Sequence, residues 1–313
     1  MESGGQRIAV ADLGTNSTRL LVAELDRSGA LTELARRTEV TRLGEGVDTT
    51  ATLSGDAIER VLVTLEAYRT LAEDHGATSA IAVATSAVRD ADNGEELARL
   101  VRERAGFDIR TISGEEEARL TFLGASSARP GTGAALVIDI GGGSTEYVVG
   151  LPGEAPSFHV STRLGSVRHT ERHLGSDPPA KDELEALAAS AGEIAAAGVP
   201  VEIREQTEVG IAVAGTATSL AAIDQGLEPY DPRRVHGHRL TLAACERMLA
   251  MLAASDLQRR REVPGLHSDR APTIVAGAVI LIESMRLFGL EHVEASEADI
   301  LHGAALAALG RAG

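Results

Sequence analysis

Residues 8–17 read IAVADLGTNS, and residues 136–145 read LVIDIGGGST. In both stretches an apolar run ends in an aspartate, which is followed at once by glycine and hydroxyl-bearing residues. Such a run predicts a buried strand, and glycine lets the next loop bring its backbone N–H groups close to a ligand. A strand, an aspartate and a Gly/Ser/Thr loop are suited to holding phosphate oxygens and their metal ion. The repetition predicts two related lobes that face one phosphate-bearing ligand.

The pattern around these two stretches predicts an α/β protein in which a β-β-β-α-β-α order occurs twice. In the first half we expect strands at 7–13, 18–25, 31–40, 79–84 and 107–112, and helices from Ser54 to Gly76, near 95–105 and over 114–125. A linker is expected at 126–133. In the second half we expect strands at 135–140, 145–150, 157–163 and 209–214, and helices from Ser166, over 181–197 and from about 216. The remainder is expected to be helical over 241–254, 270–288 and 299–311, with a short strand at 292–296.

Composition narrows the classes of function. The formal net charge of −16 argues against general nucleic-acid binding. No apolar run is long enough to cross a bilayer, and the polar N-terminal segment does not resemble a signal peptide. The single Cys245 fits a reducing compartment and is expected in the core of a helix. We therefore expect a cytoplasmic protein with neither nucleic acid nor membrane as a partner.

Although the net charge is negative, the chain contains two basic clusters, RRVHGHR at 233–239 and RRR at 259–261. The first is either a solvated surface patch or a track for an anionic substrate. The second reads as an ordinary helix end.

The two loops are the strongest candidates for chemistry. The first comprises Asp12, Gly14, Thr15, Asn16 and Ser17, and its alternative reading is a tight hairpin turn. The second comprises Asp139, Gly141, Gly142, Gly143, Ser144 and Glu146. Three consecutive glycines cost backbone entropy and therefore need a reason. Close approach to a phosphate group supplies that reason, and the occurrence of both loops together favours phosphate binding.

Three further positions could serve the same chemistry. Glu115, Glu116 and Glu117 begin a helix, where they either complement the helix dipole or supply a general base toward water. Arg89 follows a strand and is either a phosphate clamp or the partner of Asp90 or Asp92. Gly215 and Thr216 form a strand-to-helix turn, which either holds an anion or only permits close packing. Spacing alone leaves these alternatives open.

The chain resembles the exopolyphosphatase and guanosine-pentaphosphate phosphatase (Ppx/GppA) family, within the actin, sugar kinase and Hsp70 superfamily. The segments that carry the resemblance are ADLGTNSTRLL (11–21), TSAVRDAD (85–92), ISGEEEARLTFLG (112–124), VIDIGGGSTEY (137–147), LGSVRHTE (164–171), AGTATS (214–219) and RAPTIVAGA (270–278). Mild departures are His169, where leucine is usual, and His238, which replaces a common aromatic residue. The chain is similar to the short, two-domain members.

The resemblance implies two ribonuclease H-like (actin-like ATPase) lobes, each a mixed sheet with flanking helices, and an active-site cleft between them. The implied domains are 1–126, with a helix at about 299–313 packing back on it, and 127–298. Glu117 matches the family's catalytic glutamate, and Arg89 matches an arginine that contacts substrate phosphate. The implied phosphate-binding residues are Gly14, Thr15, Asn16, Ser17, Gly141, Gly142, Gly143, Ser144, Gly215 and Thr216. The implied metal ligands are Asp12, Asp139 and Glu146.

The resemblance also implies the substrate and cofactor. We expect metal-dependent hydrolysis of the terminal phosphoanhydride bond of inorganic polyphosphate, with Mg²⁺, or Mn²⁺ as the alternative metal. Guanosine pentaphosphate (pppGpp) is the alternative substrate, because it presents the same type of bond. Two alternatives belong to other functional classes: a sugar or acetate kinase, and a nucleotide-gated binding protein. A homodimer is one expected assembly.

Overall fold

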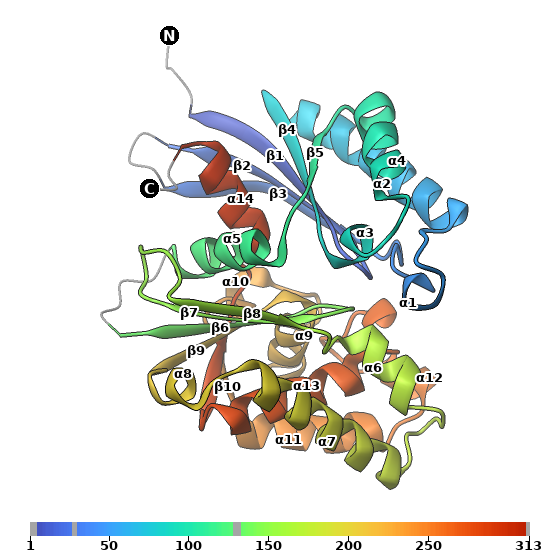
Figure 1. The fold of residues 1–313 in the computed structure, drawn as a ribbon, viewed down its shortest axis with the longest axis vertical. Helices are drawn as coiled ribbons and strands as arrows, with labels where there is room; N and C mark the ends of the chain where they lie inside the picture. Colours follow the sequence, from blue (N-terminus) through green and yellow to red (C-terminus); the bar gives the residue numbers. More distant parts are fainter. Residues whose placement is uncertain (1–4, 27–29, 128–132, 311–313) are drawn as a thin grey trace. The chain divides into compact units, whose positions relative to one another are not determined.

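The computed structural model describes residues 5–26, 30–127 and 133–310, and it divides into two compact units (Figure 1). The first unit comprises Met1–Gly124 and Ile300–Gly313, and the second comprises Ala125–Asp299. Most of the expected linker, residues 128–132, and the end of the expected C-terminal helix, residues 311–313, lie outside the described residues.

The sheet of the first unit is mixed. Its strands are β1 (Gln6–Leu13), β2 (Thr18–Leu25), β3 (Leu31–Glu39), β4 (Ser79–Ala84) and β5 (Asp108–Thr111), in the order β3-β2-β1-β4-β5. The pairs β1–β2 and β2–β3 are antiparallel, whereas β1–β4 and β4–β5 are parallel. β1 lies at the centre, and its last six residues are all buried. This burial explains why the strand reads as a continuous apolar run.

Helices cover both faces of this sheet. They are α1 (Val47–Thr50), α2 (Gly55–Asp74), α3 (Ser86–Arg89), α4 (Gly94–Leu100), α5 (Gly114–Ser126) and α14 (Ile300–Ala308). Along β1, Ala9 and Ala11 pack in the cluster that contains the apolar side chains of α2. Ile8 and Val10 pack in another cluster, with Leu120 of α5 and the side chains of α14. The period-two alternation of a strand thus builds two separate layers.

The helix boundaries have local causes. The side chain of Ser54 accepts a hydrogen bond from the N–H of Ala57, which caps α2 at the expected residue. The helix expected near 95–105 is not uniform, because α4 passes into a π-helical segment at Val101–Ala105 that ends at Gly106 with φ +67°. The four-residue helices α1 and α3 were not predicted, since one turn is too short to show a period.

The sheet of the second unit repeats this order. Its strands are β6 (Ala135–Ile140), β7 (Thr145–Gly150), β8 (Phe158–Thr162), β9 (Val209–Val213), β10 (Arg239–Thr241) and β11 (His292–Ala295), in the order β10-β11-β9-β6-β7-β8. The antiparallel β6, β7 and β8 correspond to β1, β2 and β3, and the parallel β9 and β11 correspond to β4 and β5. β10 adds an antiparallel edge strand that was not predicted.

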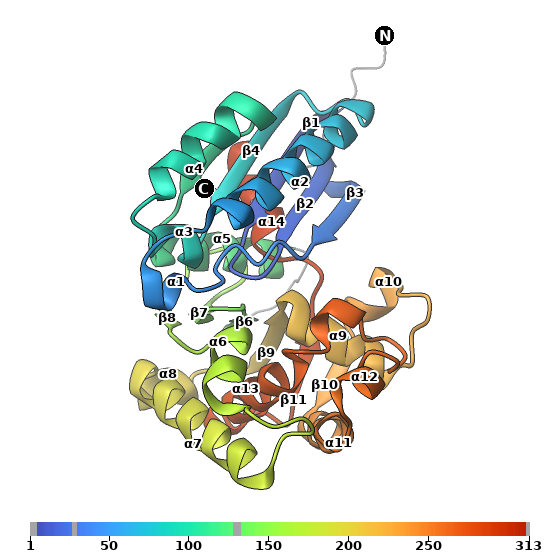
Figure 2. The same ribbon diagram turned by 90° about the vertical axis from the view of Figure 1, so that its right-hand side faces the viewer.

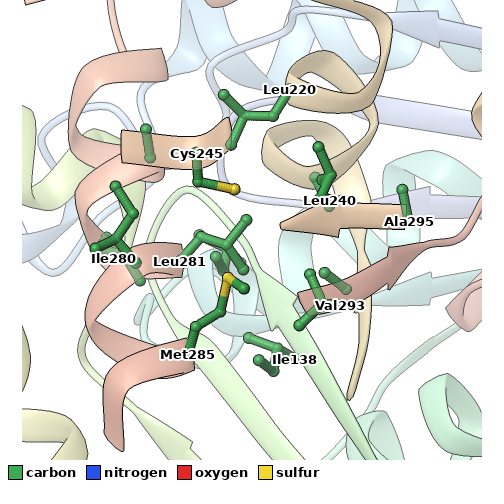
Figure 3. Packing of buried hydrophobic residues seen from close by; sticks show 14 of the residues in the cluster. Ile138, Leu220, Leu240, Cys245, Ile280, Leu281, Met285, Val293 and Ala295 are labelled. Atoms are coloured by element: carbon green, nitrogen blue, oxygen red, sulfur yellow. The ribbon is translucent and has the colours of Figure 1, made fainter. Parts of the chain in front are cut away.

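The helices of the second unit pack around one mainly aliphatic core. They are α6 (Ser166–His173), α7 (Lys181–Gly198), α8 (Val201–Glu205), α9 (Ala214–Asp224), α10 (Pro232–Val235), α11 (Leu242–Ala253), α12 (Leu257–Arg260) and α13 (Ile274–Leu287), with a 3₁₀ turn at Ser268–Arg270. Figure 3 shows Cys245 among aliphatic side chains that include Leu220 and Leu281. Burial raises the pKa of the Cys245 thiol to about 12, in keeping with the expected core position.

The fold-class prediction of two mixed sheets with flanking helices is confirmed. Among the described residues, no helix is both long and apolar enough to cross a membrane.

α14 joins the first unit across a long gap in sequence, and Figures 1 and 2 show this red helix beside the blue strands β1 and β2. Gly303 of α14 faces the backbone of α5, where a Cβ atom would overlap the carbonyl oxygen of Leu120.

We expect Gly303→Ala to lower the free energy of unfolding by about 1–3 kcal/mol, because the backbone of α5 cannot move aside cheaply. Urea unfolding measures this loss.

Gly55→Ala is the matched control, because no atom lies within 4 Å of a Cβ at that position. It should leave stability unchanged or raise it. An equal effect of the two substitutions would contradict the close approach of α14 and α5.

Candidate active site

The first loop is held by hydrogen bonds to its carbonyl groups. The N–H of Gly14 donates to the carbonyl of Ser17 over 3.1 Å, which closes the turn between β1 and β2. The carbonyls of Asn16 and Thr15 accept from the N–H groups of Arg42 and Gly44, both over 2.9 Å. The loop is also fixed through a side chain, since the hydroxyl of Thr15 lies 2.9 Å from the hydroxyl of Ser86 in α3.

The second loop is built in the same way. The N–H of Gly141 donates to the carbonyl of Ser144 over 2.9 Å. The carbonyls of Gly141 and Gly142 accept from the N–H groups of Ser166 and Val167, both over 3.0 Å, at the start of α6.

Gly165 allows α6 to approach this loop, because a Cβ there would overlap the backbone of Gly142 and Gly143. The Nε of Arg168 then donates to the carbonyl of Gly143 over 2.9 Å. In each unit a neighbouring segment therefore satisfies the loop carbonyls and fixes the loop in place.

Each of the two aspartates predicted to bind metal faces a charged residue across its hairpin. The two facing residues differ in sign, because one is an arginine and the other is a glutamate. Asp12 faces Arg19 in the β1–β2 register, and the Nε and Nη2 atoms of Arg19 lie 2.9 Å and 2.6 Å from its Oδ2. Asp139 faces Glu146 in the β6–β7 register, and both carboxylates are buried. The hydroxyl of Ser161 donates to Oε1 of Glu146 over 2.7 Å.

Two carboxylates directly opposite each other repel. Oxygen donors of this kind suit Mg²⁺, which proteins commonly bind through one or two carboxylates together with substrate phosphates and water. Asp139 and Glu146 therefore provide carboxylate oxygens of the kind that a divalent cation binds, and Asp12 is ion-paired with Arg19.

The three glutamates at the start of α5 occupy different environments. Glu115 is exposed, and Glu116 forms an ion pair with Arg119 at 2.9 Å. Glu117 is 7% exposed, and its Oε2 lies 3.1 Å from Nη1 of Arg89. The same Nη1 donates to the carbonyl of Ile112 over 2.9 Å. The alternative pairing of Arg89 with Asp90 or Asp92 is therefore wrong.

Burial raises the pKa of Glu117 to about 7, and the nearby charge of Asp12 acts in the same direction. The Arg89 guanidinium opposes this shift through its charge and its hydrogen bond. A buried carboxyl group with a pKa near neutrality, beside a fixed arginine, is typical of a general base.

The Gly215–Thr216 turn packs closely on an arginine. β9 runs parallel to β6 with Val213 beside Asp139, so this turn lies at the same end of the sheet as the second loop. A Cβ at Gly215 would overlap the guanidinium of Arg270. The guanidinium of Arg270 therefore packs directly on this turn and places a cation there.

Several residues of the basic clusters have polar partners. In the first, His238 lies 2.8 Å from Asp224, Arg239 contacts His292, and Arg233 lies 3.7 Å from Asp231. In the second, Arg260 is 4% exposed and is ion-paired with Asp177. The reading of 259–261 as a helix end is confirmed, because α12 ends at Arg260, but Arg260 is buried and paired and is not part of a solvated patch.

The sequence analysis missed Arg19, Ser86, Ser161 and the role of Arg168. A signal for the first was present, because a short hairpin loop fixes which residues face each other, and this register places Arg19 opposite Asp12. No local pattern indicates the other three, which reach their partners from distant segments.

The two units, each a mixed sheet with an aspartate–glycine loop, place the chain in the class of actin-like ATPase folds. The chain belongs to the Ppx/GppA phosphatase family, whose sequence model matches residues 21–312. It is 36% identical to a Mycobacterium tuberculosis protein named Exopolyphosphatase 2, over 97% of this chain and 99% of the relative. Membership of a phosphatase family confirms the predicted enzyme class over the kinase and binding-protein readings.

Solved structures agree with this placement. The crystal structure of the Aquifex aeolicus member of the Ppx/GppA family is 29% identical with a TM-score of 0.83, and the match covers 97% of each chain. The crystal structure of an exopolyphosphatase from Cytophaga hutchinsonii is 26% identical with a TM-score of 0.87. That match covers 97% of this chain and 98% of the other.

His169 lies buried in α6, the helix that holds the second loop, and its ring stacks on that of His173 with centroids 5.5 Å apart. Among the described residues, the Nε2 atom of neither ring has a hydrogen-bond partner. Burial lowers the pKa of His169 to about 4, and this is opposed by the Gly165 carbonyl and reinforced by the charges of His173 and Arg172.

We expect His169→Leu to stabilise the protein at pH 5 by about 2 kcal/mol, with little effect at pH 7.5. The native state binds the His169 proton less well than the unfolded state, in which the pKa is 6.5. Wild-type stability should therefore fall as the pH drops from 6.5 through about 4. Urea unfolding at both pH values measures the difference. The exposed His159 provides the control substitution, and an equal gain at both pH values would contradict the assignment.

Proposed function

We propose that this protein is an exopolyphosphatase, which hydrolyses the terminal phosphoanhydride bond of inorganic polyphosphate and releases orthophosphate. The observation that carries the proposal is the buried Glu117, whose pKa of about 7 and contact with Arg89 suit a general base. The name of the Mycobacterium tuberculosis relative, which matches over nearly its whole length, supports the choice of polyphosphate.

In the proposed reaction, Glu117 accepts a proton from a water molecule as the water oxygen bonds to the terminal phosphorus atom. The bond from that phosphorus to the bridging oxygen breaks, and the shortened chain leaves with the electron pair of this bond. Positioning and charge stabilisation provide most of the rate enhancement in phosphoryl transfer. Arg89 orients the carboxylate, and its remaining N–H groups are proposed to bind an oxygen of the transferred phosphate.

The loops are proposed to hold the phosphate chain through backbone N–H groups and hydroxyl groups. The carbonyls of Thr15, Asn16, Gly141 and Gly142 already accept hydrogen bonds from the protein, so the backbone need not rearrange to bind an anion. The proposed phosphate-binding residues are Gly14, Thr15, Asn16, Ser17, Gly141, Gly142, Gly143, Ser144, Gly215 and Thr216.

Asp139 and Glu146 are the residues proposed to hold Mg²⁺, with Mn²⁺ as the alternative. When bound, the ion would neutralise negative charge on the phosphate oxygens. Asp12 was predicted as a third ligand. Because Arg19 is already ion-paired with it, we propose for Asp12 an indirect role through water.

A panel of four substrates tests the function: short polyphosphate, long polyphosphate, pppGpp and ATP, each with Mg²⁺. We expect phosphate release from polyphosphate. Release from pppGpp alone would contradict the proposal in favour of the alternative substrate, and release from none would contradict both.

We expect Glu117→Gln to lower kcat on polyphosphate by about 10²–10⁴-fold, because the amide cannot accept the proton. KM should change by less than about threefold, since the carboxylate acts on water rather than holding the chain.

Wild-type kcat/KM should fall tenfold per pH unit below about pH 7, as Glu117 becomes protonated. Glu116→Gln is the matched control, because that neighbour is paired with Arg119. Full activity of Glu117→Gln would disprove the assignment.

We expect Glu146→Gln to raise the melting temperature of the metal-free protein, because it removes the repulsion with Asp139, which is worth about 0.2–1 kcal/mol. The same substitution should abolish the rise in melting temperature that Mg²⁺ produces in the wild type. Thermal denaturation with and without Mg²⁺ separates the two effects. The exposed Glu262→Gln serves as the control. A Mg²⁺-dependent rise of the same size in Glu146→Gln would rule out this residue as a ligand.

A further inference from the structure

A segment that follows β3 packs directly on the first loop. The N–H groups of Arg42 and Gly44 donate to the carbonyls of Asn16 and Thr15. The side chain of Leu43 between them is fully buried. Gly44 permits this contact, because a Cβ there would overlap the side chain of Thr15. We refer to residues 41–44 as the loop-supporting segment.

The backbone of the loop-supporting segment is fixed on its other side as well. The hydroxyl of Thr41 lies 2.9 Å from that of Thr18 at the start of β2, and both groups are buried. The Nε of Arg60 in α2 donates to the carbonyl of Thr41 over 2.8 Å. The position of Arg42 is thus set by contacts with β2, α2 and the first loop, none of which involve its own side chain.

Arg42 has a backbone conformation that arginine rarely adopts. Its φ is +49°, in the left-handed region that favours glycine. Glycine would make the same backbone hydrogen bonds to the loop without this strain. Glycine does occupy position 46, where φ is +78°. Strained non-glycine residues are concentrated at binding and active sites, so this conformation favours a functional role for the side chain.

The side chain of Arg42 is exposed. Within residues 5–26, 30–127 and 133–310, its guanidinium forms neither a hydrogen bond nor an ion pair. Arg89 and Arg19 differ, because each contacts a carboxylate of the same unit. The backbone of Arg42 thus lies beside Asn16, and its exposed side chain carries a positive charge on a chain whose net charge is −16.

We propose that Arg42 is a further substrate-binding residue, whose guanidinium binds a phosphate group of the polyphosphate chain at the first loop. This inference rests on the proposed function. A guanidinium binds two phosphate oxygens in a fork, and a backbone held in place reduces the entropy lost on binding. Arg42 does not contact Glu117 in the structure, so it contributes to affinity and not to the activation of water.

The test compares Arg42→Gly, Arg42→Lys and Ala51→Gly in the 313-residue chain. Ala51 also has a positive φ, of 52°, and is exposed at the end of α1. Ala51→Gly therefore relieves backbone strain as Arg42→Gly does, but it leaves the net charge unchanged. Arg247→Gln, at an exposed position of α11, removes one positive charge elsewhere and completes the controls.

For Arg42→Gly we expect KM for polyphosphate to rise about tenfold or more, with kcat within about twofold of the wild type. Arg42→Lys should recover part of the affinity, because it keeps the charge but not the fork. The rise of KM with salt should be shallower in Arg42→Gly than in the wild type. Ala51→Gly and Arg247→Gln should leave KM unchanged.

An unchanged KM in Arg42→Gly, with an active wild type, would overturn this inference alone. The same holds if Ala51→Gly raises KM equally, because the effect would then come from the backbone. A wild type that releases no phosphate from polyphosphate would instead overturn the proposed function, and this inference with it.

Discussion

Each of the two candidate phosphate-binding loops depends on hydrogen bonds donated to its carbonyl groups. A glycine-rich loop has many accessible conformations, and it holds an anion well only when one of them is selected in advance. In the first unit, the segment after β3 makes this selection through Arg42 and Gly44. In the second unit, the start of α6 makes it through Ser166 and Val167. Both segments donate to the loop carbonyls and so fix the orientation of the peptide dipoles in each loop.

The two repeated hairpins, β1–β2 and β6–β7, share a backbone arrangement but differ in the charges of their side chains. Both loops close through an N–H bond from the glycine that lies two residues after the aspartate. Both place a charged residue opposite that aspartate, but this residue is Arg19 in one unit and Glu146 in the other. One hairpin therefore pairs a carboxylate with a guanidinium, whereas the other places two carboxylates opposite each other. The same architecture thus supplies two different electrostatic environments.

Much of the secondary structure and both glycine loops were predictable from the sequence, because the patterns that indicate them lie within a few neighbouring residues. The apolar run of β1, the Ser54 cap of α2 and the glycine loops all follow from neighbouring residues. β10 was missed because three residues are too few to show an alternation, and the π-helical segment was missed because its residues have ordinary helix propensity.

The chemistry was less predictable. Spacing alone did not distinguish Glu117 from Glu115 and Glu116. Their difference comes from burial against distant residues, including Arg89. Packing of Arg270 on Gly215 likewise brings together residues more than fifty positions apart, which no local pattern could indicate.

The first unit is discontinuous in the chain, and this has a consequence for biosynthesis. The apolar side chains of Ile8 and Val10 belong to a layer that α14 completes. While the ribosome is still synthesising the residues between Gly124 and Ile300, this layer lacks one of its helices. The second unit is contiguous and has all of its strands before α14 is made. The strands β1 to β5 are therefore synthesised well before the helix that completes their apolar layer, and a nascent chain carries an uncovered apolar surface until Ile300–Ala308 emerges.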